Sequence, residues 1–195
     1  MKKYLFLFAF LIAFVQFSIA QVKWDADPLH SNVHFSVNHL GISFVDGLFQ
    51  KMSGTVETKN DKDWNGATFN FTIETASIDT RVKQRDDHLR SDDFFNAEKY
   101  PHITLKNGKL TKVKGDKYTL NGDLTIRDVT KTVAFDVTFH GVITDPWGNT
   151  RAGLTGTIEI DRTAFNIKYD NKLPSGVDEV GKKVKIEVNT ELVKQ

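Results

Sequence analysis

Residues 133–140 read Val-Ala-Phe-Asp-Val-Thr-Phe-His, and this stretch decides which class of fold the chain can adopt. Valine and phenylalanine occupy every second position, and Ala134, Asp136, Thr138 and His140 lie between them. Successive side chains of a β-strand point to opposite faces of its sheet, so this spacing predicts a strand with one apolar face. We therefore expect residues 133–140 to cover an apolar core on one side and to face solvent on the other.

The same alternation recurs along most of the chain. Further rows with one apolar face span residues 33–37, 68–73, 118–126, 154–160 and 184–192. We find no alternation of strands with helices that would imply a parallel sheet, and no internal repeat or linker. About eight amphipathic strands joined by hairpins can satisfy their apolar faces by closing into a barrel or by stacking as a sandwich. The sequence therefore predicts one all-β domain.

Clusters of turn-forming residues separate the predicted strands at 106–108, 114–116 and 145–149. One longer segment, residues 80–95, is charged and lacks the strand period. Within it we expect a short helix over Val82–Arg90, and Ser91-Asp92-Asp93 resembles a helix N-cap before Phe94 and Phe95. A loop of this length is either a lid or binding loop, or a surface excursion that covers one end of the fold.

Residues 1–20 have the pattern of a secretory signal peptide. A basic start at Lys2 and Lys3 precedes a nearly uninterrupted apolar run over residues 4–17, and small residues follow at Ser18 and Ala20. The run of about 14 residues is shorter than the roughly 20 that a membrane-spanning helix needs. We therefore expect cleavage after Ala20, a domain over residues 21–195, and a periplasmic or secreted protein without stable membrane insertion after processing.

The overall composition excludes several classes of protein. The chain has 195 residues, with 26 Lys and Arg against 25 Asp and Glu, so it lacks the strong positive field typical of nucleic-acid binding. Because it has no cysteine, it cannot form disulfides, thiolate zinc sites, iron–sulfur clusters or thiol nucleophiles. The G-x-S-x-G, P-loop and G-x-G-x-x-G motifs are also missing. We therefore predict no catalytic residue, no cofactor and no nucleic-acid partner.

Two short clusters of acidic residues and histidine are the candidates for a metal site. They are Asp25-x-Asp27-x-x-His30 and Asp86-Asp87-His88. Such clusters on polar segments are usually solvated, so we predict no metal at either of them.

Arg85, Asp86 and His88 admit three interpretations. They form a polar rim that recognises a ligand headgroup, or an ion-pair network that holds the loop, which we favour. In the third interpretation, the least favoured, they act as an enzyme site on a bound lipid.

The apolar rows leave the interior open to two interpretations, because a filled barrel and a hollow barrel show the same alternation. A cavity of several hundred Å³ favours ligand binding, and a filled interior favours a structural or interaction module. His39 shares its parity with Val33, Phe35 and Val37, so it either hydrogen-bonds inside the core or faces a cavity mouth.

From Trp24 to about Leu192 the chain resembles the YceI-like family of exported, polyisoprenoid-binding proteins with a lipocalin-like barrel. The matching motifs are DPLHS (27–31), VHFSV (33–37), HLGIS (39–43), GLF (47–49), ASIDT (76–80), RDDHLRSDDFF (85–95), KYP (99–101), GDLTI (122–126), VTK (129–131) and DRTAF (161–165). The run R-D-x-H-L-x-S-x-x-F-F is the most specific of them. The family usually has glycine where this chain has Asp128 and Asn166, and both residue types tolerate a positive φ.

The resemblance implies an extended eight-stranded antiparallel barrel, with a short helix in a long loop, around an elongated apolar channel. It implies binding of a long-chain amphiphile: a polyisoprenoid, an isoprenoid quinone or a fatty-acid derivative. It does not imply catalysis. A homodimer through an exposed strand edge is compatible with the sequence.

The candidate ligand-binding residues come from the matching strand rows and from the loops expected near the channel mouth. The strand candidates are Phe35, Val37, Phe69, Phe71, Ile73, Leu124, Ile126, Phe135 and Phe165. The mouth candidates are His39, Arg85, Asp86, His88, Phe94 and Tyr100.

Overall fold

The computed structural model describes residues 21–195, and the signal-peptide prediction for residues 1–20 lies outside this range. The strands are β1 (Val22–Ala26), β2 (Asn32–His39), β3 (Ser43–Phe49), β4 (Met52–Thr58), β5 (Thr68–Glu74), β6 (Ile78–Asp79), β7 (His102–Lys114), β8 (Lys117–Ile126), β9 (Val129–Thr144), β10 (Thr150–Asp161) and β11 (Val180–Lys194). The helices are α1 (Lys83–Arg90) and the short 3₁₀ turns η1 (Thr75–Ser77) and η2 (Arg162–Phe165).

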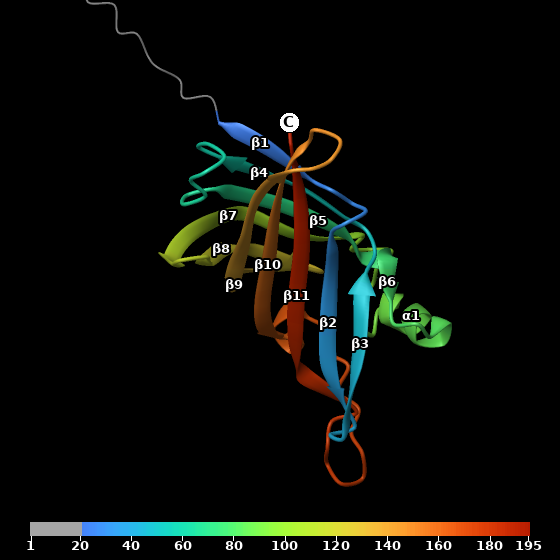
Figure 1. Ribbon diagram of the computed structural model, residues 1–195. Coiled ribbons are helices and arrows are strands. Elements are labelled where there is room, and N and C mark those ends of the chain that lie inside the picture. Colours follow the sequence, from blue (N-terminus) through green and yellow to red (C-terminus); the bar gives the residue numbers. More distant parts are fainter. Residues whose placement is uncertain (1–20) are drawn as a thin grey trace, which may run out of the picture.

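Eight antiparallel strands close into a barrel (Figure 1). Around the ring the order is β1-β4-β5-β7-β8-β9-β10-β11, and the pairing of β1 with β11 closes it. The closing register places Trp24 opposite Lys194 and Ala26 opposite Leu192. The predicted all-β, eight-stranded antiparallel barrel with one short helix is therefore confirmed.

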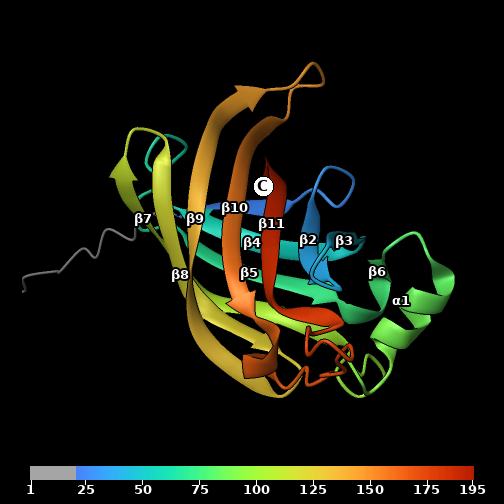
Figure 2. The ribbon, with the colours of Figure 1, turned by 90° about the horizontal axis from the view of Figure 1, so that it is seen from below.

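Three strands lie outside this ring, which a simple hairpin meander does not anticipate. Strand β11 is long enough to pair with β1 near its end and with β2 along its first part, where Val188 lies opposite Val33. The β2–β3 hairpin and the short β6 therefore extend the barrel wall from β11. Helix α1 follows β6 and lies beside it, outside the sheet (Figure 2).

Two local predictions are wrong, each for a backbone reason. Residues 106–108 do not end a strand: they form an irregularity inside β7, where Asn107 adopts a φ of 54°. Gly122 on β8 faces this irregularity, and a Cβ there would meet the Gly108 Cα at 3.1 Å. Ser91 does not start a helix but ends α1, because its backbone N–H and its hydroxyl both donate to the His88 carbonyl oxygen.

Two further turns test the positions where the family usually has glycine. Asn166 adopts the left-handed conformation expected of it, with a φ of 60°, and ends η2. In the β8–β9 turn it is Arg127, and not Asp128, that takes the positive φ, of 54°. The predicted turns at 114–116 and 145–149 join β7 to β8 and β9 to β10.

The apolar core has two parts. We call the first the packed end; it is centred on Trp24, Val56, Trp64, Leu110 and Leu192, all fully buried. We call the second the cavity end; its buried members include Phe49, Met52, Phe94, Ile126 and Phe165. Among residues 21–195, no helix combines the length and apolar character needed to cross a membrane.

Candidate ligand-binding cavity

The barrel encloses an apolar cavity of about 160 Å³. Its lining comes from every strand except β1 and β6, and from α1, the segment after it, η2 and the loop before β11. The lining is almost entirely hydrocarbon and aromatic. The residues that line it are Val33, Phe35, Val37, Phe49, Met52, Phe69, Phe71, Ile73, Leu89, Phe94, Phe95, Ile103, Leu105, Leu120, Leu124, Ile126, Phe135, Val137, Leu154, Gly156, Ile160, Arg162, Ile167, Val180, Val184, Ile186, Val188 and Thr190.

The strand alternation places these side chains inside. On β2, Val33, Phe35 and Val37 share one parity and line the cavity, whereas His34 lies exposed between them. Aromatic contacts then connect the wall to the α1 region: the ring centroids of Phe49 and Phe95 are 5.6 Å apart, edge to face. The cavity is therefore lined both by the sheet and by the loop that covers it.

The volume of the cavity is smaller than the several hundred Å³ typical of small-molecule sites. A cavity of about 150 Å³ with a similar apolar lining holds one benzene-sized molecule. An extended hydrocarbon chain would therefore have to displace lining side chains. Met52 is suited to this movement, because methionine is unbranched and adapts to irregular spaces.

Arg162 is the only charged residue that lines the cavity among residues 21–195. It is buried, and its guanidinium donates to four backbone carbonyl oxygens: Gly181 at 2.9 Å, Ile167 at 2.9 Å, Tyr169 at 2.6 Å and Val180 at 2.8 Å. Within the described chain, no carboxylate lies within ion-pair distance of it. Burial lowers the pKa of Arg162 relative to its usual value, since a desolvated cation is disfavoured.

Nine of the predicted ligand-binding residues line this cavity. They are Phe35, Val37, Phe69, Phe71, Ile73, Phe94, Leu124, Ile126 and Phe135. The other six lie outside the lining: His39, Arg85, Asp86, His88, Tyr100 and Phe165. Phe165 is buried in the core of the cavity end beside the cavity, and Tyr100 precedes β7, where its carbonyl oxygen accepts from Thr75 Oγ1 at 2.8 Å.

Arg85 and Asp86 hold the loop rather than facing a ligand. Asp86 is buried, and one of its carboxylate oxygens accepts from the backbone N–H of Thr80 at 2.8 Å and from its hydroxyl at 2.5 Å. The Arg85 guanidinium donates to the Thr80 hydroxyl at 2.7 Å and to its carbonyl at 2.8 Å. This geometry favours the interpretation of a network that fixes the loop over that of a headgroup rim.

His88 and His39 lie at the surface of the cavity end. The His88 ring pairs with Asp93 at 2.8 Å and packs edge to face on Phe94 and Tyr169. His39 ends β2, where it is partly exposed and lies opposite Val180. Neither arrangement brings a nucleophile, a base and an orienting group together.

Sequence reasoning missed Arg162 and several lining residues, among them Phe49, Met52 and Phe95. Phe49, Phe95 and Arg162 all lie in motifs that carry the family resemblance, so a signal for them was present. Met52 lies in an irregular apolar stretch, where the parity of the strand is not readable from the sequence.

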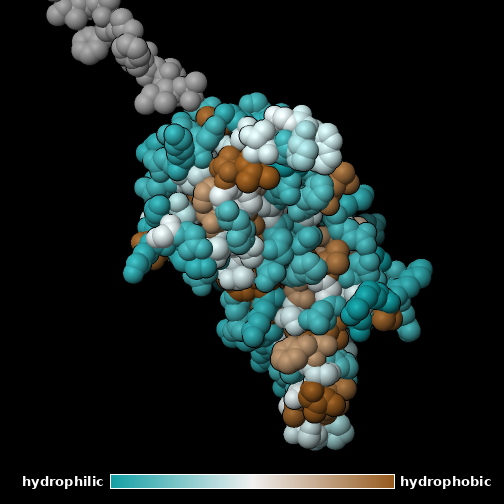
Figure 3. Space-filling model, in the orientation of Figure 1, coloured by the Kyte–Doolittle hydropathy of each residue, from teal (hydrophilic) through white to brown (hydrophobic). Residues whose placement is uncertain are grey.

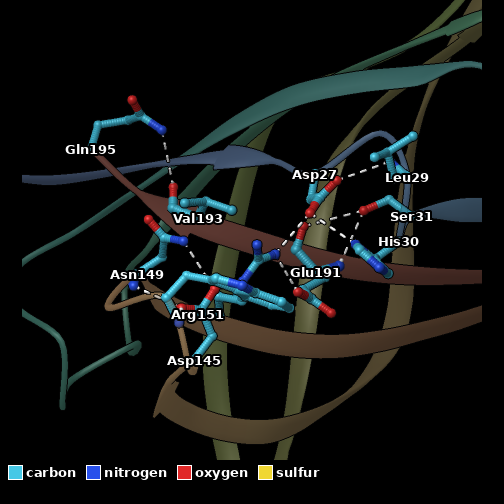
Figure 4. Close-up of polar contacts among 11 residues, drawn as sticks. Asp27, Leu29, His30, Ser31, Asp145, Asn149, Arg151, Glu191, Val193 and Gln195 are labelled. Atoms are coloured by element: carbon cyan, nitrogen blue, oxygen red, sulfur yellow. Dashed lines mark hydrogen bonds and ion pairs between the residues drawn. The ribbon is translucent and has the colours of Figure 1, made fainter.

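Of the first candidate metal cluster, Asp27 and His30 belong to an ion-pair network at the packed end (Figure 4), whereas Asp25 pairs with Lys23 at 3.4 Å. Possible ligand atoms of Asp27, His30 and Glu191 lie within 4.8 Å of one another. However, the Arg151 guanidinium donates to Asp27 at 2.7 Å, to Glu191 at 2.5 Å and to Asp145 at 2.6 Å. A cation is therefore already present among these carboxylates, as part of the protein.

The network shifts the pKa of its members. Burial alone would raise the pKa of Asp27, but hydrogen bonds from Arg151, His30 and the Leu29 backbone outweigh it and lower the pKa to about 2. The pKa of Asp145 is also held well below its usual range against burial, by Arg151 and by the side chain and backbone of Asn149. The hydrogen bond to Asp27 raises the pKa of His30.

The second cluster, Asp86-Asp87-His88, does not converge on one point. Asp86 turns inward to Thr80, whereas the Asp87 carboxylate pairs with Lys83 at 2.6 Å and with Arg90 at 3.1 Å.

The fold and the site together define a closed antiparallel barrel around an apolar cavity. A sequence model of the YceI-like domain matches residues 24–192. This chain therefore belongs to the YceI-like family. Protein YceI of Escherichia coli O157:H7 is 40% identical over 151 residues, which cover 77% of this chain and 78% of that protein.

Solved structures share the fold. BcnA of Burkholderia cenocepacia superimposes with a TM-score of 0.72 at 25% identity, over 85% of this chain and 98% of that one. A polyisoprenoid binding domain from Saccharophagus degradans superimposes with a TM-score of 0.66 at 12% identity, over 88% of this chain and 98% of that domain. The second likeness shows the barrel architecture alone.

Proposed function

We propose that this protein holds a long-chain amphiphile in the barrel cavity as a carrier or buffer. The ligand is a polyisoprenoid, an isoprenoid quinone or a fatty-acid derivative. The observation that carries the proposal is the enclosed cavity, whose lining is apolar except at Arg162 and Thr190. Each buried methylene contributes about 0.8 kcal/mol, so a chain with few polar contacts can bind and can offset the displacement of lining side chains.

Membership of the YceI-like family supports lipid binding in general. The polyisoprenoid binding domain of Saccharophagus degradans shares the barrel architecture, so we include polyisoprenoids among the proposed ligands. No comparable observation favours catalysis, because Arg85, Asp86 and His88 are engaged in contacts within the loop.

The polar end of the ligand lies at Arg162 in this proposal. The guanidinium is a buried positive charge that donates to backbone carbonyls and has no carboxylate in direct contact, so an anionic or strongly accepting headgroup would complement it. A binding comparison between a long-chain fatty acid and the alcohol of the same chain length tests this orientation. Tighter binding of the acid is expected; equal affinity would contradict the placement of the polar end.

We propose that the protein acts after export, in the periplasm or outside the cell, with residues 1–20 removed. The intact mass of protein recovered from the exported fraction tests this. A chain that begins at Gln21 is expected, and a full-length chain retained in the cytoplasm would contradict it.

Native mass spectrometry of the exported protein, followed by organic extraction, tests lipid binding directly. The expected result is a non-covalent adduct that the extraction releases as an apolar chain with one polar end. The proposal fails if the protein carries no amphiphile and takes up none when isoprenyl lipids and fatty acids are added. The same spectra report whether a homodimer forms.

A further inference from the structure

Two loops form an exposed apolar tip at one end of the molecule. We define the apolar tip as residues 40–44 of the β2–β3 turn and residues 173–177 of the loop before β11. Ile42 is 86% exposed, Phe44 63% and Val177 40%. The two loops project together at the lower end of the ribbon, where the space-filling view shows hydrophobic atoms at the surface (Figures 1 and 3). Neither segment contains a charged residue.

The apolar tip is held in shape by its own backbone. The Leu40 N–H donates to the Glu179 carbonyl at 3.0 Å, which ties the first loop to the second. Within the second loop, the Leu173 N–H donates to the Val177 carbonyl at 2.9 Å. Gly41, with a φ of 75°, packs so closely that a Cβ there would meet Val177 Cγ1 at 3.0 Å. These contacts fix the backbone and leave the large side chains facing solvent.

The apolar tip lies close along the chain to residues that line the cavity. Val37 and Val180 line the cavity, and Val180 lies opposite His39, the residue immediately before the tip. Ile167 also lines the cavity and begins the segment that leads to the second loop. Only two residues on each chain segment separate the cavity lining from the tip: Asn38 and His39 after Val37, and Asp178 and Glu179 before Val180.

We propose that the apolar tip inserts into the surface of a lipid bilayer, where the bound amphiphile enters and leaves the cavity. This inference rests on the proposed lipid-binding function. Burying Ile42, Phe44 and Val177 among acyl chains removes large apolar side chains from water. A carrier of a poorly soluble chain needs such a contact, because the chain would otherwise have to cross water during exchange.

The shape and charge of the apolar tip favour a bilayer over a protein partner. A specific protein interface needs about 800 Å² from each partner, whereas the tip consists of two narrow turns. Charged residues begin immediately behind it, with Lys172 paired to Asp178 at 2.5 Å. Lysine side chains at this depth would reach the headgroups while the tip lies below them. Because the tip itself carries no charge, we expect insertion to need no anionic lipid.

Vesicle flotation tests the proposal on purified exported protein. We compare phosphatidylcholine vesicles with phosphatidylethanolamine–phosphatidylglycerol vesicles, at low and at high salt. The variant is Ile42→Ser with Phe44→Ser. The matched control is Ile143→Ser with Trp147→Ser, at the opposite end, where these side chains are 64% and 81% exposed. We expect wild type and control to float with both vesicles at either salt, and the tip variant to bind at least tenfold more weakly.

A soluble probe separates this inference from the proposed function. Fluorescence titration with cis-parinaric acid, without vesicles, should give equal affinity for wild type and tip variant. Transfer of the bound probe to acceptor vesicles should be at least tenfold slower for the tip variant.

Three outcomes would overturn membrane insertion while leaving lipid binding intact. In the first, the probe binds to the wild type but the wild type does not float with the vesicles. In the second, the tip variant floats as well as the wild type. In the third, the control variant loses as much vesicle binding as the tip variant. Failure of the probe to bind while flotation persists would instead overturn the proposed function.

Discussion

The packed end and the cavity end of the barrel are built from the same alternating strands, yet the interior is filled around Trp24 and Trp64, whereas the open volume lies at the cavity end and reaches the nearest members of the packed end, among them Phe135. At the packed end the Trp24 and Trp64 rings lie 5.1 Å apart, and Phe139 packs on Trp64 at 4.8 Å. Each indole N–H has a partner: Trp24 donates to Thr58 Oγ1 at 3.0 Å, and Trp64 to the Asp61 carbonyl at 3.1 Å. At the cavity end, phenylalanine and aliphatic side chains leave about 160 Å³ open.

The difference teaches that side-chain volume, and not alternation, decides whether a barrel interior can hold a ligand. Indoles fill the cross-section and fix it through their N–H groups, whereas phenylalanine and valine have no polar atom to anchor them. The two ends also differ in how an arginine is held. Carboxylates surround Arg151 at the packed end, whereas backbone carbonyls surround Arg162 at the cavity end.

The largest effect is expected from Trp64→Ala at the packed end. Removing a fully buried indole leaves a large cavity and should lower the free energy of unfolding by about 3–5 kcal/mol. Phe35→Ala at the cavity end should cost less than half as much, because Phe35 is only half-buried and borders open space. Urea unfolding of both variants measures the contrast. Equal losses would show that the two ends are packed alike.

The next effect concerns acid stability, which we expect to reside in the Arg151 network. A carboxyl whose pKa is lower in the folded state stabilises the fold above its unfolded pKa, and this stability is lost as pH falls through the folded value. For Asp27 the window runs from 3.8 down to about 2. The wild type should therefore lose stability as pH falls below about 4.

Arg151→Met breaks this network and should lower the Tm at neutral pH, because it leaves buried carboxylates without their cation. Its stability should also fall less steeply between pH 4 and pH 2, since the folded pKa of Asp27 moves back toward its unfolded value. The control His30→Ala should keep most of the acid loss. His30→Ala should remove only a small effect of opposite sign. Because the pKa of His30 is raised in the folded state, the histidine stabilises the fold below pH 6.5, and this stabilisation is lost as pH rises. Thermal melts across pH test both; an unchanged acid slope in Arg151→Met would exclude the network as its source.

A smaller effect is expected from Asp86→Ala, which releases the loop at the cavity end. Two donors of the buried Thr80 lose their acceptor, which should cost about 1–3 kcal/mol. Hydrogen exchange should rise over residues 80–97 and stay unchanged at the packed end. Asp87→Ala is the matched control, because that carboxylate is half exposed and should change stability little. If exchange does not rise locally, the loop is held by other contacts.

The sequence predicted the barrel because alternation at six rows, 133–140 included, directly records which side chains face inward. Eight of the nine predicted cavity-lining residues come from these rows; the ninth, Phe94, came from a loop motif that matches the family. The sequence could not predict where the interior is filled and where it is open, since Trp24, Trp64 and Leu110 meet only after strands distant in sequence pair. Nor could it place Arg162 in the cavity wall, because two of the four carbonyls that hold its guanidinium come from a loop without a readable period and the other two from the start of the distant strand β11.

Gly156→Leu is expected to have the smallest effect on stability. It is also the sharpest test of whether the cavity holds the ligand. Gly156 lines the cavity, and a Cβ there would lie 3.8 Å from both Phe135 and Val137, which is ordinary contact. The leucine side chain should enter the cavity and change the free energy of unfolding by less than about 1.5 kcal/mol. Amphiphile binding should weaken at least tenfold, because the added branch occupies the space that the chain needs.

Gly153→Leu on the same strand is the matched control, because a Cβ there would meet His140 at 3.5 Å and Gly153 does not line the cavity. Titration with cis-parinaric acid compares the two variants with the wild type. Loss of binding in Gly156→Leu alone would place the ligand inside the cavity. Equal affinity in all three proteins would place the ligand elsewhere, and the open volume would then be a packing defect that the packed end avoids by using tryptophan.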